Sequence, residues 1–103
     1  MKRRFADHED EQDALAGLAD AMARLRTAAQ MRAFLVDLCT PAELEAMTDR
    51  WRVVPLLLDA VPYREIHDRT AVSVTTIGRV ARTLDRGEGG YSAAMRRSTA
   101  RAG

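Results

Sequence analysis

Apolar residues recur every three or four positions along most of this 103-residue chain, and this spacing constrains the fold more than any other feature. It places apolar side chains on one face of an α-helix, whereas a strand requires strict alternation. Alanine, leucine and arginine, which favour helices, are abundant, and there are only three prolines. Since this length supports one hydrophobic core and not two, we expect a single all-α domain over residues 1–103.

The first half of the chain predicts two helices and then a third. Apolar residues keep helical spacing over about residues 9–39, with a weak break near Thr27. The sequence T-P-A-E at 40–43 then marks a strong helix start, because Thr40 is a suitable N-cap, proline fits the first helical position and the glutamate completes a capping box. Pro55 lacks a backbone donor, so we expect this helix to kink or restart near it.

Two further helices are predicted in the second half, and their spacing is typical of a helix-turn-helix over about residues 62–86. The first ends near Arg69. Ser73 caps the second, which ends near Gly87, a residue able to adopt the left-handed conformation that terminates helices. The remaining residues, 88–103, are expected to form a basic tail. Four aliphatic side chains are expected to pack the two helices together: Ile66, Val72, Ile77 and Val80.

The second helix of this pair carries two stripes of opposite character. One face is apolar (Ile77, Val80, Ala81 and Leu84), and another is polar (Thr75, Arg79, Arg82 and Arg86). The first turn, with Val74, Thr75 and Gly78, has side chains short enough to approach base edges in a major groove. The arginine stripe is either an ordinary solvated face or a surface for a negatively charged partner.

The charges are unevenly distributed, although the net charge is only +1. Residues 7–20 contain six acidic residues and neither lysine nor arginine, whereas from Pro62 onward eight arginines stand against four acidic residues. The second half is therefore the part expected to bind an anionic partner. With a helix-turn-helix in that half, double-stranded DNA is the partner that we expect.

Other classes of function find little support. Cys39 is the single cysteine, so it forms no internal disulfide, and we expect a buried thiol. His8 and His67 belong to no ligand-spaced pair, so no metal or other cofactor is predicted. An enzyme is not expected, because the chain shows no paired carboxylates in an apolar context and no Cys/His pairing. Neither a secretory signal nor a run of membrane-spanning length is present, so we expect a cytoplasmic protein without a membrane partner.

The predicted helices of the first half carry a longer apolar stripe than one small domain needs to cover itself. A partner chain would bury the surplus, so we expect a homodimer that these helices hold together. The stripe comprises Leu15, Leu18, Met22, Leu25, Met31, Phe34, Leu35 and Leu38.

Several motifs in fixed order resemble those of the Trp repressor superfamily, most closely its YerC/YecD branch. They are L-C-T-P-A-E-x-E-A-M-x-x-R-W at 38–51, Y-R-E-I at 63–66, S-V-T-T-I-G-R-V-x-R-T-L at 73–84 and G-G-Y at 89–91. The resemblance covers about residues 30–91. It implies an all-α, intertwined homodimer whose N-terminal helices interlock and whose two helix-turn-helix units reach successive major grooves.

The resemblance also implies roles for individual residues. The family's base and phosphate contacts fall on Arg64, Val74, Thr75, Thr76 and Gly78. Arginines that hold the amino-acid ligand in the tryptophan-sensing member match Arg50 and Arg79, and other pocket positions match or are similar to Thr40, Thr76 and Thr83. The polar half of an effector pocket is thus kept.

The apolar half of that pocket differs. Val80 stands where the tryptophan sensor has a glycine that leaves room for the indole, so tryptophan is not expected to be the effector, while another small molecule is possible. Residues 59–62 also form a connection that is one residue shorter than in the relatives.

Together these observations predict a dimeric, sequence-specific DNA-binding transcriptional regulator that represses by occupying a promoter. Arg64, Arg79, Arg82 and Arg86 are expected to neutralise phosphates, and the first turn of the second helix is expected to read bases. The alternative is a helical dimeric interaction module that uses the arginine face to dock an acidic protein.

Overall fold

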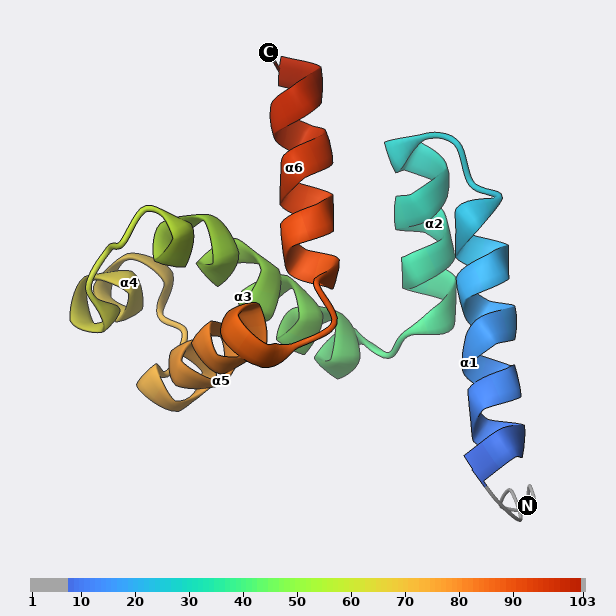
Figure 1. Ribbon diagram of the computed structural model, residues 1–103, viewed down its shortest axis with the longest axis horizontal. Coiled ribbons are helices and arrows are strands. Elements are labelled where there is room, and N and C mark those ends of the chain that lie inside the picture. Colours follow the sequence, from blue (N-terminus) through green and yellow to red (C-terminus); the bar gives the residue numbers. More distant parts are fainter. Residues whose placement is uncertain (1–7, 103) are drawn as a thin grey trace. The chain divides into compact units, whose positions relative to one another are not determined.

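The computed structural model describes the backbone of residues 8–102 and the side chains of residues 10–96. Within residues 8–102 all regular elements are helices, which confirms the all-α prediction (Figure 1). In chain order they are α1 (His8–Ala23), α2 (Ala28–Leu38), α3 (Pro41–Leu58), α4 (Tyr63–Thr70), α5 (Val74–Arg86) and α6 (Gly90–Ala102). The chain divides into two compact units, Met1–Thr40 and Pro41–Gly103.

The N-terminal unit contains α1 and α2, and the predicted break near Thr27 is confirmed. The Thr27 side chain caps α2, since its hydroxyl oxygen accepts a hydrogen bond of 3.0 Å from the backbone N–H of Gln30. None of the side chains described between residues 10 and 40 is buried, and Leu15 is 67% exposed. This unit has apolar stripes but no core of its own.

The C-terminal unit is built around six buried aliphatic side chains. The two buried residues of α3 are Val53 and Val54, and the prediction for the helix-turn-helix is confirmed, because its four expected core residues are at most 4% exposed. Burying a side chain of this size contributes about 1.5–3 kcal/mol, so the cluster dominates the stability of this unit. The full set is Val53, Val54, Ile66, Val72, Ile77 and Val80.

Pro55 lies inside α3, which continues as one helix from Pro41 to Leu58, so of the two expected outcomes, a kink or a restart, the restart does not occur. The proline is exposed and lies in the last turns, where the loss of one hydrogen bond is tolerated. Ala60 then ends the helix in the left-handed region at φ 60°. The backbone N–H of Ala60 donates to Leu57 O, and that of Val61 donates to Leu56 O, both at 3.0 Å, as in a Schellman motif.

The end of α5 differs from the prediction in one detail. Gly87 does end the helix, but its φ is −82°, so left-handed freedom is not the reason for glycine there. A Cβ at this position would lie 2.6 Å from the backbone oxygen of Thr83, which means that the tight approach of the chain excludes any side chain. The glycine in the left-handed region is Gly89, at φ 83°.

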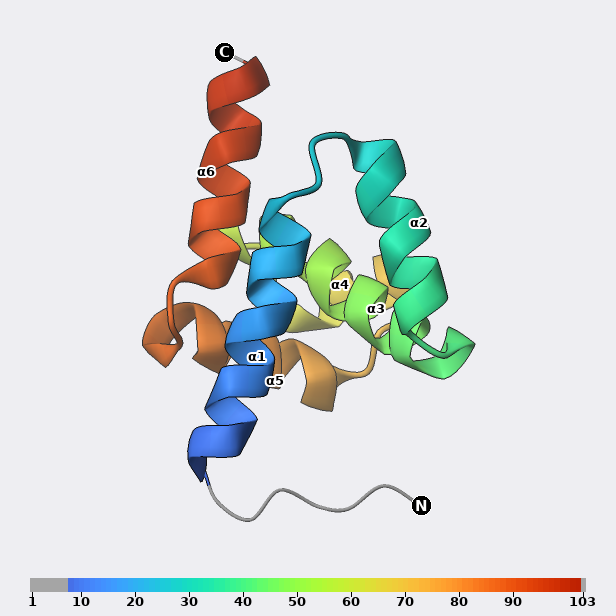
Figure 2. The same cartoon turned by 90° about the vertical axis from the view of Figure 1, so that its right-hand side faces the viewer.

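Residues 88–103 were expected only as a basic tail, whereas residues 90–102 form α6. Tyr91 and Met95 on α6 pack against the core of the C-terminal unit. The ring of Tyr91 lies 6.3 Å from that of Trp51 on α3, centroid to centroid. Figure 2 shows α6 leading away from α5. Two apolar residues one turn apart, Tyr91 and Met95, thus anchor this basic segment as a helix.

No helix in the described part of the chain is long and apolar enough to cross a membrane.

Ala71 forms the turn between α4 and α5 at φ 65°, a conformation that costs an L-residue about 1–2 kcal/mol. Replacing Ala71 by glycine should therefore raise the free energy of unfolding by roughly 1 kcal/mol, as measured by urea denaturation. The matched control is Ala46→Gly on the exposed side of α3, which should lower it by about the same amount. A loss of stability in Ala71→Gly would contradict the strain at this turn.

Candidate nucleic-acid interface

The turn between α4 and α5 is fixed by polar side chains. The hydroxyl of Thr70 donates to the backbone oxygen of Ile66 at 2.7 Å and accepts from the backbone N–H of Val72 at 3.1 Å. Nδ1 of His67 donates to the backbone oxygen of Val72 at 2.8 Å, so this ring nitrogen carries the proton. A guanidinium nitrogen of Arg52 on α3 donates to Thr70 O at 3.2 Å. These bonds set the direction in which α5 leaves the turn.

The first turn of α5 is capped as predicted. Ser73 accepts a 3.1 Å hydrogen bond from the backbone N–H of Thr76, and its own hydroxyl donates to the Thr76 side chain at 3.0 Å. Thr76 is half-buried and engaged in the cap, so it supports the first turn instead of projecting from it. Val74, 51% exposed, and Thr75, also exposed, are the side chains that this turn presents to solvent.

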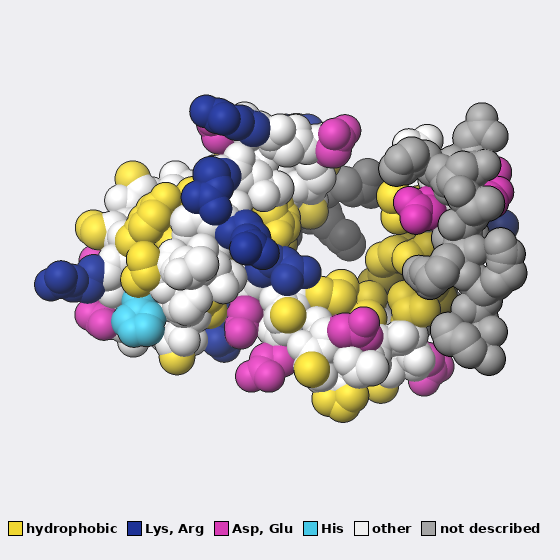
Figure 3. Space-filling view, turned by 90° about the horizontal axis from the view of Figure 1, so that it is seen from below, with side chains coloured by type: hydrophobic (Ala, Val, Ile, Leu, Met, Phe, Trp, Pro, Cys, Tyr) yellow, Lys and Arg dark blue, Asp and Glu magenta, His cyan; other side chains and the backbone are white. Residues whose placement is uncertain are grey.

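The arginine stripe of α5 lies on the side opposite to the core. Ile77 and Val80 are buried, whereas the guanidinium-bearing residues of the stripe, Arg79, Arg82 and Arg86, are exposed. Figure 3 shows a row of Lys and Arg side chains over the part of the molecule where α5 lies in Figure 1. The structure thus separates the two faces of α5 as the sequence predicts.

The exposed arginines differ in their ion pairs. Arg69 is paired with Glu65 at 3.1 Å, and Arg86 lies 3.5 Å from Asp85 in a pair that is exposed on both sides. Within the described residues, Arg64, Arg79 and Arg82 form no ion pair with a carboxylate. Their charge is therefore available to an external anion.

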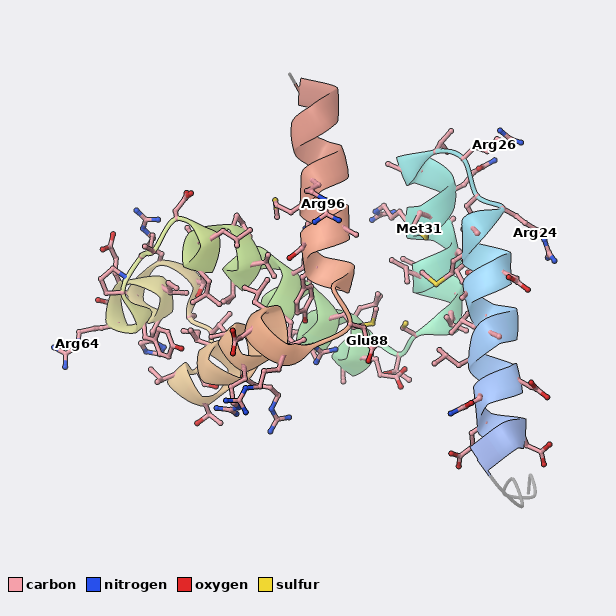
Figure 4. The ribbon with its side chains drawn as sticks, in the orientation of Figure 1. Arg24, Arg26, Met31, Arg64, Glu88 and Arg96 are labelled. Atoms are coloured by element: carbon pink, nitrogen blue, oxygen red, sulfur yellow. The ribbon has the colours of Figure 1, made fainter. Side chains whose placement is uncertain are left out.

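Arg64 belongs to the first turn of α4, and Figure 4 shows its side chain extending away from that helix. It is exposed, as the contact role that the resemblance implies requires. Gly78 is half-buried on α5, one turn before Arg82.

The residues of the predicted effector pocket do not share one environment. Val80 is 1% exposed and belongs to the same buried cluster as Val53, Ile66 and Ile77, so its side chain fills space between α3 and α5. Arg50 on α3 is half-buried and Arg79 is exposed.

Of the three threonines predicted for this pocket, Thr40 and Thr83 are exposed and Thr76 is half-buried. The hydroxyl of Thr83 donates to the backbone oxygen of Arg79 at 3.1 Å, and Thr40 directly precedes α3. Cys39 is half-buried instead of fully buried as expected, since α2 ends at the residue before it and the N-terminal unit lacks a core.

Sequence reasoning missed the residues that hold the turn, namely Arg52, His67 and Thr70. Glycine is usual at the place of Ala71 in such a turn, and an aliphatic residue is usual at the place of Thr70. The position of Thr70 at the end of a predicted helix was a signal for its hydrogen bond, because a threonine hydroxyl there can donate to the carbonyl four residues earlier. Tyr63 was also missed, although its ring lies beside Gly78.

The Trp repressor protein family model matches residues 13–99. The chain belongs to the Trp repressor family. This confirms the resemblance inferred from the motifs, and it extends the match into α1 and α6. The family consists of regulatory DNA-binding proteins.

Two similar proteins support this assignment. An uncharacterized protein named YerC from Bacillus subtilis (strain 168) is 36% identical over 64 residues, which are 62% of this chain. The chain covers 62% of the length of that protein. A crystal structure of a candidate Trp repressor from Staphylococcus aureus superposes with a TM-score of 0.78 at 28% identity and covers 90% of this chain and 96% of the other. This Trp repressor family member is thus similar to YerC.

Proposed function

We propose that this Trp repressor family member binds double-stranded DNA as a homodimer, reads a specific sequence in the major groove and represses transcription by occupying a promoter. The observation that carries this proposal is the stripe on α5, whose side chains face solvent while the opposite face of the helix is buried. A helix held in this way can enter a major groove with its apolar face still covered.

The roles of the individual residues on α4 and α5 follow from their chemistry. Arg64, Arg79 and Arg82 are exposed, carry permanent positive charge and form no ion pair among the described residues, so they suit DNA phosphates. Arg86 adds charge at the end of the stripe. Val74 and Thr75 project from the first turn of α5 and suit base edges. Thr76 and Gly78 shape this turn and its approach to the DNA.

The dimer is supported by the lack of a core in the N-terminal unit. Two helices without a single buried side chain among residues 10–40 cannot offset the entropy of their own ordering. A second copy of the chain would cover the stripe that includes Leu15 and Leu38, both more than half exposed. In this proposal residues 9–39 dimerise, residues 62–86 bind DNA, and both belong to one domain.

The apolar half of the effector pocket is occupied in this proposal. The buried side chain of Val80 takes the space that an indole would need, so free tryptophan does not control the protein. Val80 packs with Ile66 and Ile77 and holds α5 in a binding-competent position without a ligand.

We expect the sequences selected from random duplex DNA to share a two-fold symmetric consensus, because a symmetric dimer presents the same α5 twice. Sedimentation should show a dimer at micromolar concentration whose dissociation removes the fold. A folded monomer would refute the dimer. Selection of no duplex sequence, together with salt-dependent binding to acidic proteins, would favour the docking module instead.

Arg82→Ala should lower the slope of log affinity against log salt by about one unit and weaken binding to all duplexes alike, since a phosphate contact carries no sequence information. Thr75→Ala should instead change which sequence is preferred. Arg24→Ala is the matched control, because Arg24 directly follows α1 and lies outside the helix-turn-helix (Figure 4). If a variant lacking both Arg79 and Arg82 kept the native affinity, the stripe would be an ordinary solvated face.

Calorimetry with L-tryptophan should give no binding for the native chain and measurable binding for Val80→Gly. Overpacking of the kind that valine causes costs roughly 1–3 kcal/mol, which is about a tenfold to hundredfold loss of affinity. Circular dichroism shows whether the Val80→Gly variant still folds. Val80→Ala is a second variant that removes fewer atoms from the same space and destabilises the helix less. Tight binding by the native chain would overturn the effector claim.

A further inference from the structure

The surroundings of Gly78 bring together two side chains from different helices. A Cβ built on Gly78 would lie 3.8 Å from a guanidinium nitrogen of Arg82 and 3.9 Å from Cε2 of Tyr63. Tyr63 is the first residue of α4, and Arg82 is one turn further along α5. We call these three residues the Gly78 site. The backbone of Gly78 forms the base of this site, and the Arg82 guanidinium and the Tyr63 ring lie at its border.

The tyrosine borders this site with a ring edge that is next to its hydroxyl. Cε2 is bonded to the ring carbon that carries the hydroxyl, and the hydroxyl oxygen itself lies more than 4 Å from the Cβ position, which leaves room between the two for a bound group. Tyr63 is 42% exposed, and no other described residue forms a hydrogen bond with its hydroxyl. A packing role would need only the ring, which leaves the hydroxyl group without a function inside the protein.

The groups at the Gly78 site suit a tetrahedral anion. Arg82 supplies only donors, the Tyr63 hydroxyl is a donor that adds no charge, and no carboxylate pairs with Arg82 among the described residues. A base edge would present donors as well as acceptors. Because Tyr63 belongs to α4, it would lie beside the groove that receives α5, where the phosphates run.

We infer that the Tyr63 hydroxyl and the Arg82 guanidinium together bind one backbone phosphate of duplex DNA over Gly78, whose lack of a side chain lets the phosphate approach. This inference rests on the proposed DNA-binding function. It assigns to Tyr63 a sequence-independent contact and to Gly78 a steric role that alanine does not fulfil.

The hydroxyl is tested with Tyr63→Phe, which keeps the ring. Its affinity for every duplex should fall by about tenfold, the loss expected for one hydrogen bond to a charged group. The slope against salt should not change, because the lost group is neutral and releases no counterion. The matched control is Tyr91→Phe, which should leave the affinity at its native value, since Tyr91 lies on α6, outside the helix-turn-helix, and its ring packs near that of Trp51.

The glycine is tested with Gly78→Ala. The new methyl group would meet Arg82 and Tyr63 only at ordinary contact distances, so the protein should fold and its melting temperature should rise. The affinity for duplex DNA should nevertheless fall by about tenfold or more, because the methyl group occupies the place of the phosphate. Gly90→Ala at the start of α6, where nothing lies within 4 Å of an added Cβ, is the control that should leave the affinity at its native value.

The outcomes separate this inference from the function on which it rests. If the native chain binds no duplex, the proposed function fails. If the native chain binds, Arg82→Ala lowers the salt slope, and Tyr63→Phe binds as tightly as the native chain, DNA binding stands and the Tyr63 contact is overturned. A loss in Tyr63→Phe that differs between sequences would place the hydroxyl on a base and also overturn the phosphate assignment.

Discussion

The contact on which the rest of the C-terminal unit depends is the close packing of six aliphatic side chains from α3, α4, the turn and α5. Valine and isoleucine have few rotamers and no polar atoms, so a cluster made of them sets the positions of three short helices closely. Helices as short as the eight residues of α4 are marginal in isolation, and this packing is what keeps α4 helical. The exposed face of α5 follows, because the cluster buries the opposite face and leaves the side with the arginine stripe to solvent.

The hydrogen bonds of the turn between α4 and α5 fix the direction in which α5 continues from this packed core. The conformation of Ala71 is unfavourable for an L-residue, yet Thr70, His67 and Arg52 hold the backbone on both sides of it. Two departures from the usual pattern therefore compensate each other: threonine in place of an aliphatic residue supplies the bonds that fix an alanine in place of a glycine. The result is a helix-turn-helix whose turn is held by hydrogen bonds within the chain.

The two units have opposite energetics. The C-terminal unit has a core of its own, whereas the N-terminal unit has apolar stripes with nothing buried among residues 10–40. In the proposed function this difference has a consequence. The helix-turn-helix is stabilised by its own core, whereas residues 9–39 would become ordered only when a second copy of the chain binds. Pairing would then decide whether two copies of α5 reach the DNA at a fixed spacing.

The sequence by itself determined the five helices α1 to α5, the caps at Thr27 and Ser73, and the buried face of α5, because these depend on local periodicity and on hydrogen bonds between near neighbours. It also determined the family, through motifs in fixed order. Only the tertiary structure decided the rest. The continuity of α3 through Pro55, the helix α6 and the approach of Tyr63 to Gly78 all depend on contacts with distant segments or on exposure, which no local pattern encodes.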